Sequence, residues 1–135
     1  MRRIWLLFRY AWALPATAAG LLLSAVAMCA GATVRFVDGV MEVGGGQVDS
    51  MISFLPPSMR FVAITLGHVI IGVDHGVLGR VRSHEQVHVR QYERWGPLFF
   101  PLYLGSSLAQ LIRGGDPHLH NHFERQAYAL TKDAE

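Results

Sequence analysis

Residues 79–96 read GRVRSHEQVHVRQYERWG and are the most helical stretch of the chain. The end of this helix is marked twice, because Gly96 is typical of a helix C-terminus and Pro97 cannot continue a helix. At its start, either Ser83 and Gln86 form a capping box or the helix begins a turn earlier. The sequence therefore predicts a single helix here that ends at Gly96.

Four runs of strand-forming residues precede this helix. They are separated by turn residues and cover residues 34–37, 40–43, 61–66 and 68–73. Asp38-Gly39 between the first two runs is a typical type I′ turn, so these runs predict a β-hairpin. The last two runs are rich in β-branched residues and meet at Gly67, which predicts a second hairpin with His68 in its second strand. The expected fold class is α+β, with short antiparallel hairpins followed by helices.

The first 32 residues contain a long apolar run. No charged residue interrupts the 23 residues from Tyr10 to Ala32, which is enough helix, at about 1.5 Å per residue, to cross the roughly 30 Å of a bilayer core. Three arginines precede the run, and Trp5, Tyr10 and Trp12 lie where interfacial aromatic residues are expected. We therefore expect residues 10–31 to form one continuous transmembrane-type helix that projects from the rest of the protein or packs weakly on it.

Residues 1–32 also fit a cleaved signal peptide, because Ala30-Gly31-Ala32 matches the small-x-small pattern of a cleavage site. The apolar run is long for a signal peptide, which favours a retained membrane anchor. The expected domain organisation is therefore an anchor or signal peptide over residues 1–32, followed by one domain over residues 33–135. The lipid bilayer is then an expected partner.

The composition excludes several classes of protein. A hydrophobic content of 51%, a charged content of 16% and a mean hydropathy of +0.27 exclude a disordered chain. The formal net charge is only +2 and the basic residues are dispersed, so no nucleic-acid partner is expected. A single cysteine, Cys29, excludes an internal disulfide and an all-cysteine zinc site. Five of the seven histidines fall between residues 84 and 122, which favours metal binding.

The predicted helix carries an HExxH motif, His84-Glu85-Gln86-Val87-His88. Residues four apart lie on one helix face with β-carbons about 6 Å apart, so both imidazoles can bind one metal ion. Glu85 points toward the same cleft, where a carboxylate can take a proton from metal-activated water. The plain alternative is two histidines on a helix face beside a solvated glutamate.

The C-terminal third contains an apolar segment and a final helix. Residues 98–112 are apolar but interrupted by Pro101 and Gly105, so we expect a buried or interfacial hairpin arm rather than a second membrane crossing. Asp116-Pro117 then predicts the start of a final helix, with aspartate as the N-cap and proline at the first helical position.

Two neighbouring stripes follow the predicted final helix. The apolar stripe, which we expect to face the core, contains Leu119, Phe123, Ala127 and Leu130. The neighbouring stripe, which can reach an inward-facing metal, contains His120, Glu124 and Tyr128. His118 and His122 lie elsewhere on the helix, and we expect both to be exposed. Catalytic zinc takes three protein ligands, so Glu124 or His120 is expected to complete the site.

The motif and the final helix together resemble a known enzyme family. His84-Glu85-x-x-His88 followed by Glu124 on a later helix resembles the gluzincin branch of zinc metallopeptidases, and the chain is similar to small bacterial membrane proteins with a minimal zincin-like domain. The resemblance extends over about residues 61–130. It implies Zn²⁺ as the cofactor, with Glu124 preferred to His120 as the third ligand. The metzincin branch is excluded, because the residues after His88 lack its glycine and third histidine.

The resemblance implies a membrane-anchored zinc metallopeptidase that hydrolyses peptide bonds in a peptide or protein substrate. Glu85 would be the general base for metal-activated water. Tyr128, one turn after Glu124, either donates a hydrogen bond to the developing oxyanion or simply packs against its neighbours, and Gln91 would orient a ligand. An extended substrate would add to the strand over residues 69–73.

A non-catalytic module is the alternative function. In this interpretation the metal only stabilises a small, membrane-associated binding or structural domain, because small cores often need such a stabilising ion. Glu85 discriminates between the two functions, since a purely structural site has no need of a carboxylate between the two histidines. Its presence favours catalysis.

Overall fold

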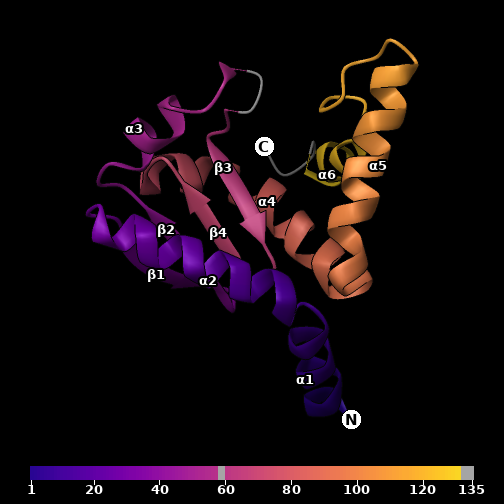
Figure 1. Ribbon diagram of the computed structural model, residues 1–135. Coiled ribbons are helices and arrows are strands. Elements are labelled where there is room, and N and C mark those ends of the chain that lie inside the picture. The colour runs from indigo at the N-terminus through magenta and orange to yellow at the C-terminus, as the bar shows by residue number, and fades with distance from the viewer. Residues whose placement is uncertain (58–59, 132–135) are drawn as a thin grey trace.

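The computed structural model describes residues 1–57 and 60–131 of the chain (Figure 1). The fold is α+β, as the sequence predicts, with one four-stranded sheet and several helices. In chain order the elements are α1 (Arg2–Trp12), α2 (Leu14–Cys29), β1 (Thr33–Val37), β2 (Val40–Gly44), α3 (Val48–Ser53), β3 (Ala63–Leu66), β4 (Val69–Gly72), α4 (His75–Trp95), the 3₁₀ helix η2 (Gly96–Leu98), α5 (Phe99–Ile112) and α6 (His122–Thr131).

The two predicted hairpins are present and join into one sheet with the strand order β1-β2-β4-β3. His68 lies in the turn of the second hairpin, so the expectation that it belongs to a strand is wrong. The inner strands β2 and β4 pair in parallel, a contact between hairpins that local patterns do not encode. Because β4 is hydrogen-bonded on both edges, the expectation that residues 69–73 add a substrate strand is also wrong.

The two faces of the sheet pack against different helices, because successive side chains of a strand point to opposite faces. On one face Val69 and Ile71 pack with Ala27 of α2. On the other face Ile70 packs with Leu78 of α4. Figure 1 shows α2 and α4 on opposite sides of the sheet. The sheet is therefore the middle of three layers, and it fixes the position of α4.

Small residues allow α2 to lie close to the sheet. The buried positions of α2 are Gly20, Ser24 and Ala27. A Cβ added at Gly20 would lie only 2.8 Å from the Cβ of Val69. The Ser24 hydroxyl donates to the carbonyl of Gly20 at 2.7 Å, so no polar group is left unsatisfied in this contact. α2 is therefore a layer of the fold and does not project from it.

The predicted continuous helix over residues 10–31 is wrong. The chain forms two helices that meet at Ala13 with a bend of 61°. Pro15 lies in the first turn of α2, where its missing N–H is tolerated, and it has no N–H with which to continue α1. Among the residues described, neither helix alone is long and apolar enough to span a bilayer, although the bent pair together has the required length and composition.

α1 is attached to the C-terminal end of α4. The Trp12 ring packs so closely on Gly96 that a side chain there would collide with it. Trp12 Nε1 also donates to the carbonyl of Arg94 at 3.3 Å. Arg9 forms an ion pair with Glu93, one turn earlier on α4. These contacts place the first helix against the fold, where the sequence had predicted weak packing.

The helices around the HExxH motif have different boundaries from those predicted. α4 begins at His75 and not near Ser83, because the Asp74 carboxylate accepts a hydrogen bond from the N–H of Val77 at 2.7 Å and caps the helix there. The apolar segment over residues 98–112 forms α5, a regular helix whose side chains are mostly exposed and of which only Phe99 is buried.

α6 begins at His122 and not at Asp116. The Asp116 carboxylate caps a separate turn instead, by accepting hydrogen bonds from the N–H groups of His118 and Leu119 at 2.8 and 2.7 Å. The predicted apolar stripe is therefore only half correct. Its members divide into buried Phe123 and Ala127 and exposed Leu119 and Leu130.

Gly67→Ala is expected to destabilise the protein by about 2–4 kcal/mol, because a side chain must adopt φ +62° there and would collide with the backbone of Thr17 in α2. Thr17 Oγ1 also accepts a hydrogen bond from the N–H of His68 at 3.1 Å, and that contact would be lost. Gly105→Ala is the matched control: Gly105 lies in α5 with open space around it, so alanine should stabilise by about 0.5–1 kcal/mol. Urea unfolding measures both, and equal stabilities would contradict the close packing of α2.

Candidate metal centre

Three side chains from two helices converge on one point. His84 and His88 of α4 and Glu124 of α6 offer ligand atoms that all lie within 4.8 Å of one another. Glu124 Oε2 is 3.0 Å from His84 Nε2, and Glu124 Oε1 is 3.2 Å from His88 Nε2. The structure thus brings together the three residues that the motif and the resemblance select. We call these three residues the metal cluster.

Asn121 positions Glu124. Its side-chain Oδ1 accepts hydrogen bonds from the N–H groups of Phe123 and Glu124 at 2.8 and 3.4 Å, which caps α6. Its Nδ2 donates to the carbonyl of Tyr103 and the hydroxyl of Ser107 at 2.9 and 2.7 Å. Asn121 is fully buried. One amide therefore joins the start of α6 to α5 and sets the direction in which Glu124 points.

Gln91 orients His88. Its Oε1 accepts a hydrogen bond from the Nδ1–H of His88 at 2.8 Å, the kind of contact expected from the sequence. Gln91 Nε2 donates to the carbonyl of Phe123 and to Gln126 Oε1, which fixes the end of the amide that faces the imidazole. His88 therefore carries a proton on Nδ1 and presents Nε2 to the cluster, as a metal ligand should.

Two further side chains contact Glu124, and no sequence pattern indicated either contact. The Tyr103 hydroxyl of α5 donates to Glu124 Oε1 at 2.6 Å. His118 Nε2 lies 3.4 Å from the same oxygen, although 58% of its side chain is exposed, as expected. No local signal marks Tyr103, because its approach depends on how α5 is oriented after the break at Gly96 and Pro97.

The alternative third ligand, His120, is not brought to the cluster. Its Nδ1 accepts a hydrogen bond from the backbone N–H of Asp116 at 2.9 Å, and the residue is exposed. His122 is exposed as well, as the sequence predicts. The Tyr128 ring packs beside the cluster, with its centroid 4.5 Å from that of His84.

Glu85 is buried beside the cluster, so the alternative of a solvated glutamate is wrong. Thr65 of β3, itself buried, donates a hydrogen bond to Glu85 Oε2 at 2.6 Å. The carboxylate is therefore held between the HExxH helix and an outer strand of the sheet. It is not one of the three residues that converge as ligands.

The charges of the cluster depend on one another. Burial by itself would raise the pKa of Glu124, but hydrogen bonds from His118, His84 and His88 outweigh burial and hold this pKa far below its usual range. Burial by itself would lower the pKa of His88, but the hydrogen bond and charge of Glu124 outweigh it and raise that pKa. Burial, together with the bond to Glu124, raises the pKa of Tyr103, so its hydroxyl stays a neutral donor. An ionised carboxylate surrounded by donors is an arrangement in which a cation can replace protons.

The donor set fits a divalent transition metal. Two imidazole nitrogens and one carboxylate oxygen are common zinc ligands, and three protein ligands leave one position for water or substrate, as in catalytic zinc sites. The surroundings fit as well, because Gln91 supports His88 and Tyr103 supports Glu124 by hydrogen bonds. Such supports are typical of metal ligands in proteins.

No protein-family model, curated protein or solved structure matches this chain. The chemistry of the site is therefore inferred from the geometry of its own residues.

Glu124→Gln is expected to weaken zinc binding by at least about 100-fold, because the amide has nearly the same shape but no charge to pair with the ion. His120→Ala is the control and should keep full zinc content, since His120 points away from the cluster. Zinc per protein after dialysis, measured by mass spectrometry, checks both variants. Loss of zinc from His120→Ala with retention in Glu124→Gln would instead identify His120 as the third ligand.

Proposed function

We propose that the protein is a membrane-associated, zinc-dependent metallopeptidase. The observation that carries this proposal is the place of Glu85, a buried carboxylate beside the metal cluster that is held by Thr65 and is not needed as a ligand. A structural zinc site has four protein ligands and no use for such a group. A hydrolytic site requires a base within reach of the attacking water.

The positions of the side chains support a hydrolytic mechanism. Zinc bound by His84, His88 and Glu124 would polarise a peptide carbonyl and make water acidic enough to attack it at neutral pH. Glu85 accepts the proton of the attacking water and passes it to the leaving amine. The Thr65 hydroxyl holds Oε2 of Glu85, which restricts rotation of the carboxylate and leaves Oε1 to carry the proton.

β3 is the strand that supports substrate binding. Within the described ranges it pairs with β4 alone. It also carries Thr65, which contacts the HExxH helix. An extended peptide that adds to the outer edge of β3 would therefore lie next to Glu85. Backbone hydrogen bonds of this kind bind a peptide without demanding a particular sequence.

Tyr103 is better placed than Tyr128 to stabilise the oxyanion. The Tyr103 hydroxyl lies beside the metal cluster and donates to Glu124 at 2.6 Å. This single proton would turn to the developing oxyanion once Glu124 binds the metal, and the raised pKa of Tyr103 keeps the proton on the hydroxyl. Tyr128 contacts His84 through its ring. We therefore extend the proposal by assigning the oxyanion donor to Tyr103.

The outer surfaces of α1 and α2 support membrane association. α1 buries none of its residues and exposes Trp5 and Phe8. α2 exposes Leu22 and Val26, while its small residues face the sheet. Because one face of α2 is occupied by the sheet, the helix pair fits an arrangement in the plane of the membrane interface, with the apolar side chains in the acyl region.

Glu85→Gln is expected to keep zinc bound and to lower kcat by about 10²–10⁴-fold, because an amide cannot accept the proton of the attacking water. His88→Ala, by contrast, should lose both zinc and activity, together with some thermal stability. Zinc content, thermal unfolding and cleavage of a broad peptide library measure the three properties.

The structural-module alternative predicts a different result for the same pair. Glu85→Gln would then match wild type in every measurement, while His88→Ala would still loosen the fold. Peptide cleavage that survives unchanged in Glu85→Gln would contradict the peptidase mechanism.

Tyr103→Phe is expected to lower kcat by about 10²–10³-fold with little change in KM, because it removes a donor that acts mainly in the transition state. Tyr128→Phe is the matched control and should retain activity, since phenylalanine keeps the ring contact with His84. Both variants are assayed at saturating zinc, because Tyr103→Phe also removes the hydrogen bond that supports Glu124. Steady-state kinetics distinguish the two tyrosines, and a larger loss of kcat in Tyr128→Phe than in Tyr103→Phe would assign the oxyanion role to Tyr128.

A further inference from the structure

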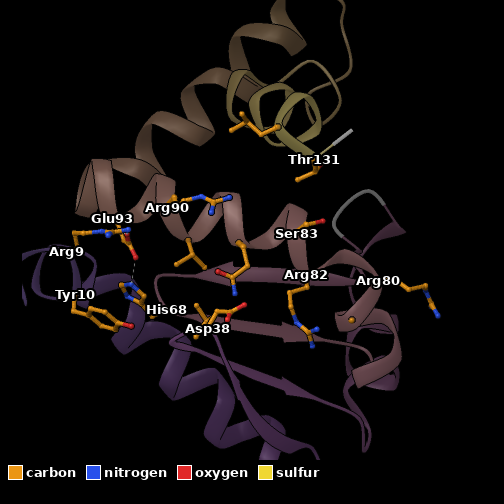
Figure 2. A pocket seen from close by; sticks show the side chains of 15 residues that line it. Arg9, Tyr10, Asp38, His68, Arg80, Arg82, Ser83, Arg90, Glu93 and Thr131 are labelled. Atoms are coloured by element: carbon orange, nitrogen blue, oxygen red, sulfur yellow. Dashed lines mark hydrogen bonds and ion pairs between the residues drawn. The ribbon is translucent and has the colours of Figure 1, made fainter. Parts of the chain in front are cut away.

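A cavity lies along α4, on a different face from the metal cluster. It has a volume of about 850 Å³ and is bounded by α4, the ends of α1 and α6, and the first hairpin (Figure 2). Ser83, Gln86 and Arg90 line it at intervals of three and four residues, so they share one helix face. His84 and His88 are not among its lining residues. The cavity is therefore separate from the proposed catalytic site.

The lining contains four arginines and the carboxylates Asp38 and Glu93, and the buried Glu42 lies behind Arg82, so the cavity has an excess of one positive charge. Two of the arginines are paired: Arg82 with the buried Glu42 at 2.8 Å, and Arg9 with Glu93. The other two, Arg80 and Arg90, form no ion pair within residues 1–57 and 60–131. Of these, Arg90 lies along the α4 wall of the cavity in Figure 2. Its guanidinium is therefore available to an anionic ligand.

Gln86 adds a donor that the fold itself does not satisfy. Its Nε2 is covered by neighbouring atoms and has no hydrogen-bond partner in the described part of the chain, so the side chain must turn outward to meet a ligand in the cavity. The Ser83 hydroxyl, one turn away, likewise forms no hydrogen bond there. Buried donors without an acceptor are rare in native proteins, and each one indicates a partner such as a ligand or water. The α4 face is open one turn before Ser83, because a Cβ added at Gly79 would meet nothing within 4 Å.

We propose that this cavity binds a phosphate group, with Arg90 as the charged contact and Gln86 and Ser83 as neutral donors. Phosphate suits the site because it offers several acceptor oxygens to three donors, and a guanidinium can bind two of those oxygens at once. The group belongs either to a soluble phosphate compound or to the headgroup of an anionic lipid. A lipid source fits the rim of the cavity, which includes Arg9 and Tyr10 of the largely exposed α1.

Inorganic phosphate is the first probe, titrated into the full-length, zinc-loaded protein in an uncharged detergent and followed by calorimetry. Saturable binding is expected. Arg90→Met should weaken it by about tenfold or more, and Gln86→Leu by about threefold or more, because charge-assisted hydrogen bonds contribute most. Arg35→Met removes the same charge from β1, outside the cavity, and should leave binding unchanged. Thermal unfolding checks that each variant is folded.

Vesicles of phosphatidylcholine, with and without phosphatidic acid, separate the two sources. If the ligand is a lipid headgroup, the protein should float with vesicles that contain phosphatidic acid. Arg90→Met should reduce this flotation, and Arg35→Met should not. If the ligand is a soluble phosphate compound, phosphate binding should depend on Arg90, whereas flotation should be the same for wild type and Arg90→Met. Phosphate bound at the zinc ion would be indifferent to Arg90. If Arg90→Met and Arg35→Met behave alike in both measurements, the proposal is overturned.

Discussion

Burial of the Glu124 carboxylate is the constraint on which the rest of the structure depends. The residue is only 4% exposed, and an ionised group at such a position must be paired, since leaving it unpaired costs about 3–5 kcal/mol. Its partners come from three segments: the two imidazoles of α4, Tyr103 of α5 and His118 of the turn before α6. One buried charge thus holds the C-terminal half of the chain together, and the donors that satisfy it also prepare a site for a cation.

α4 transmits this constraint to the sheet, because its faces pack against different layers. Leu78 and Val89 pack with the sheet, whereas His84 and His88 face α6. The helix has 21 residues and no break, so these faces move as one body. Packing of α4 on the sheet therefore sets where His84 and His88 lie. The same packing places Glu85 against β3, where Thr65 holds it.

The sequence was sufficient for features that depend on local geometry, and insufficient for contacts between distant segments. The spacing of His84 and His88 places them on one face by helix geometry alone. Glu124 required a family resemblance, because its register depends on where α6 begins, and Asp116 caps a different turn. The parallel pairing of β2 with β4 and the approach of α5 to the cluster have no local signature. Hydropathy over residues 10–31 indicated apolar surroundings without distinguishing a bilayer from the face of a sheet.

X-ray absorption at the zinc edge of the zinc-loaded protein tests the central claim most directly. Two imidazole nitrogens, one carboxylate oxygen and one water should give a four-coordinate shell of nitrogen and oxygen at about 2.0–2.2 Å, with multiple-scattering features for two imidazoles only. A sulfur shell at about 2.3 Å would place Cys29 at the metal, and a third imidazole would bring in His118 or His120. Either result would contradict a site built from His84, His88 and Glu124 with one open position.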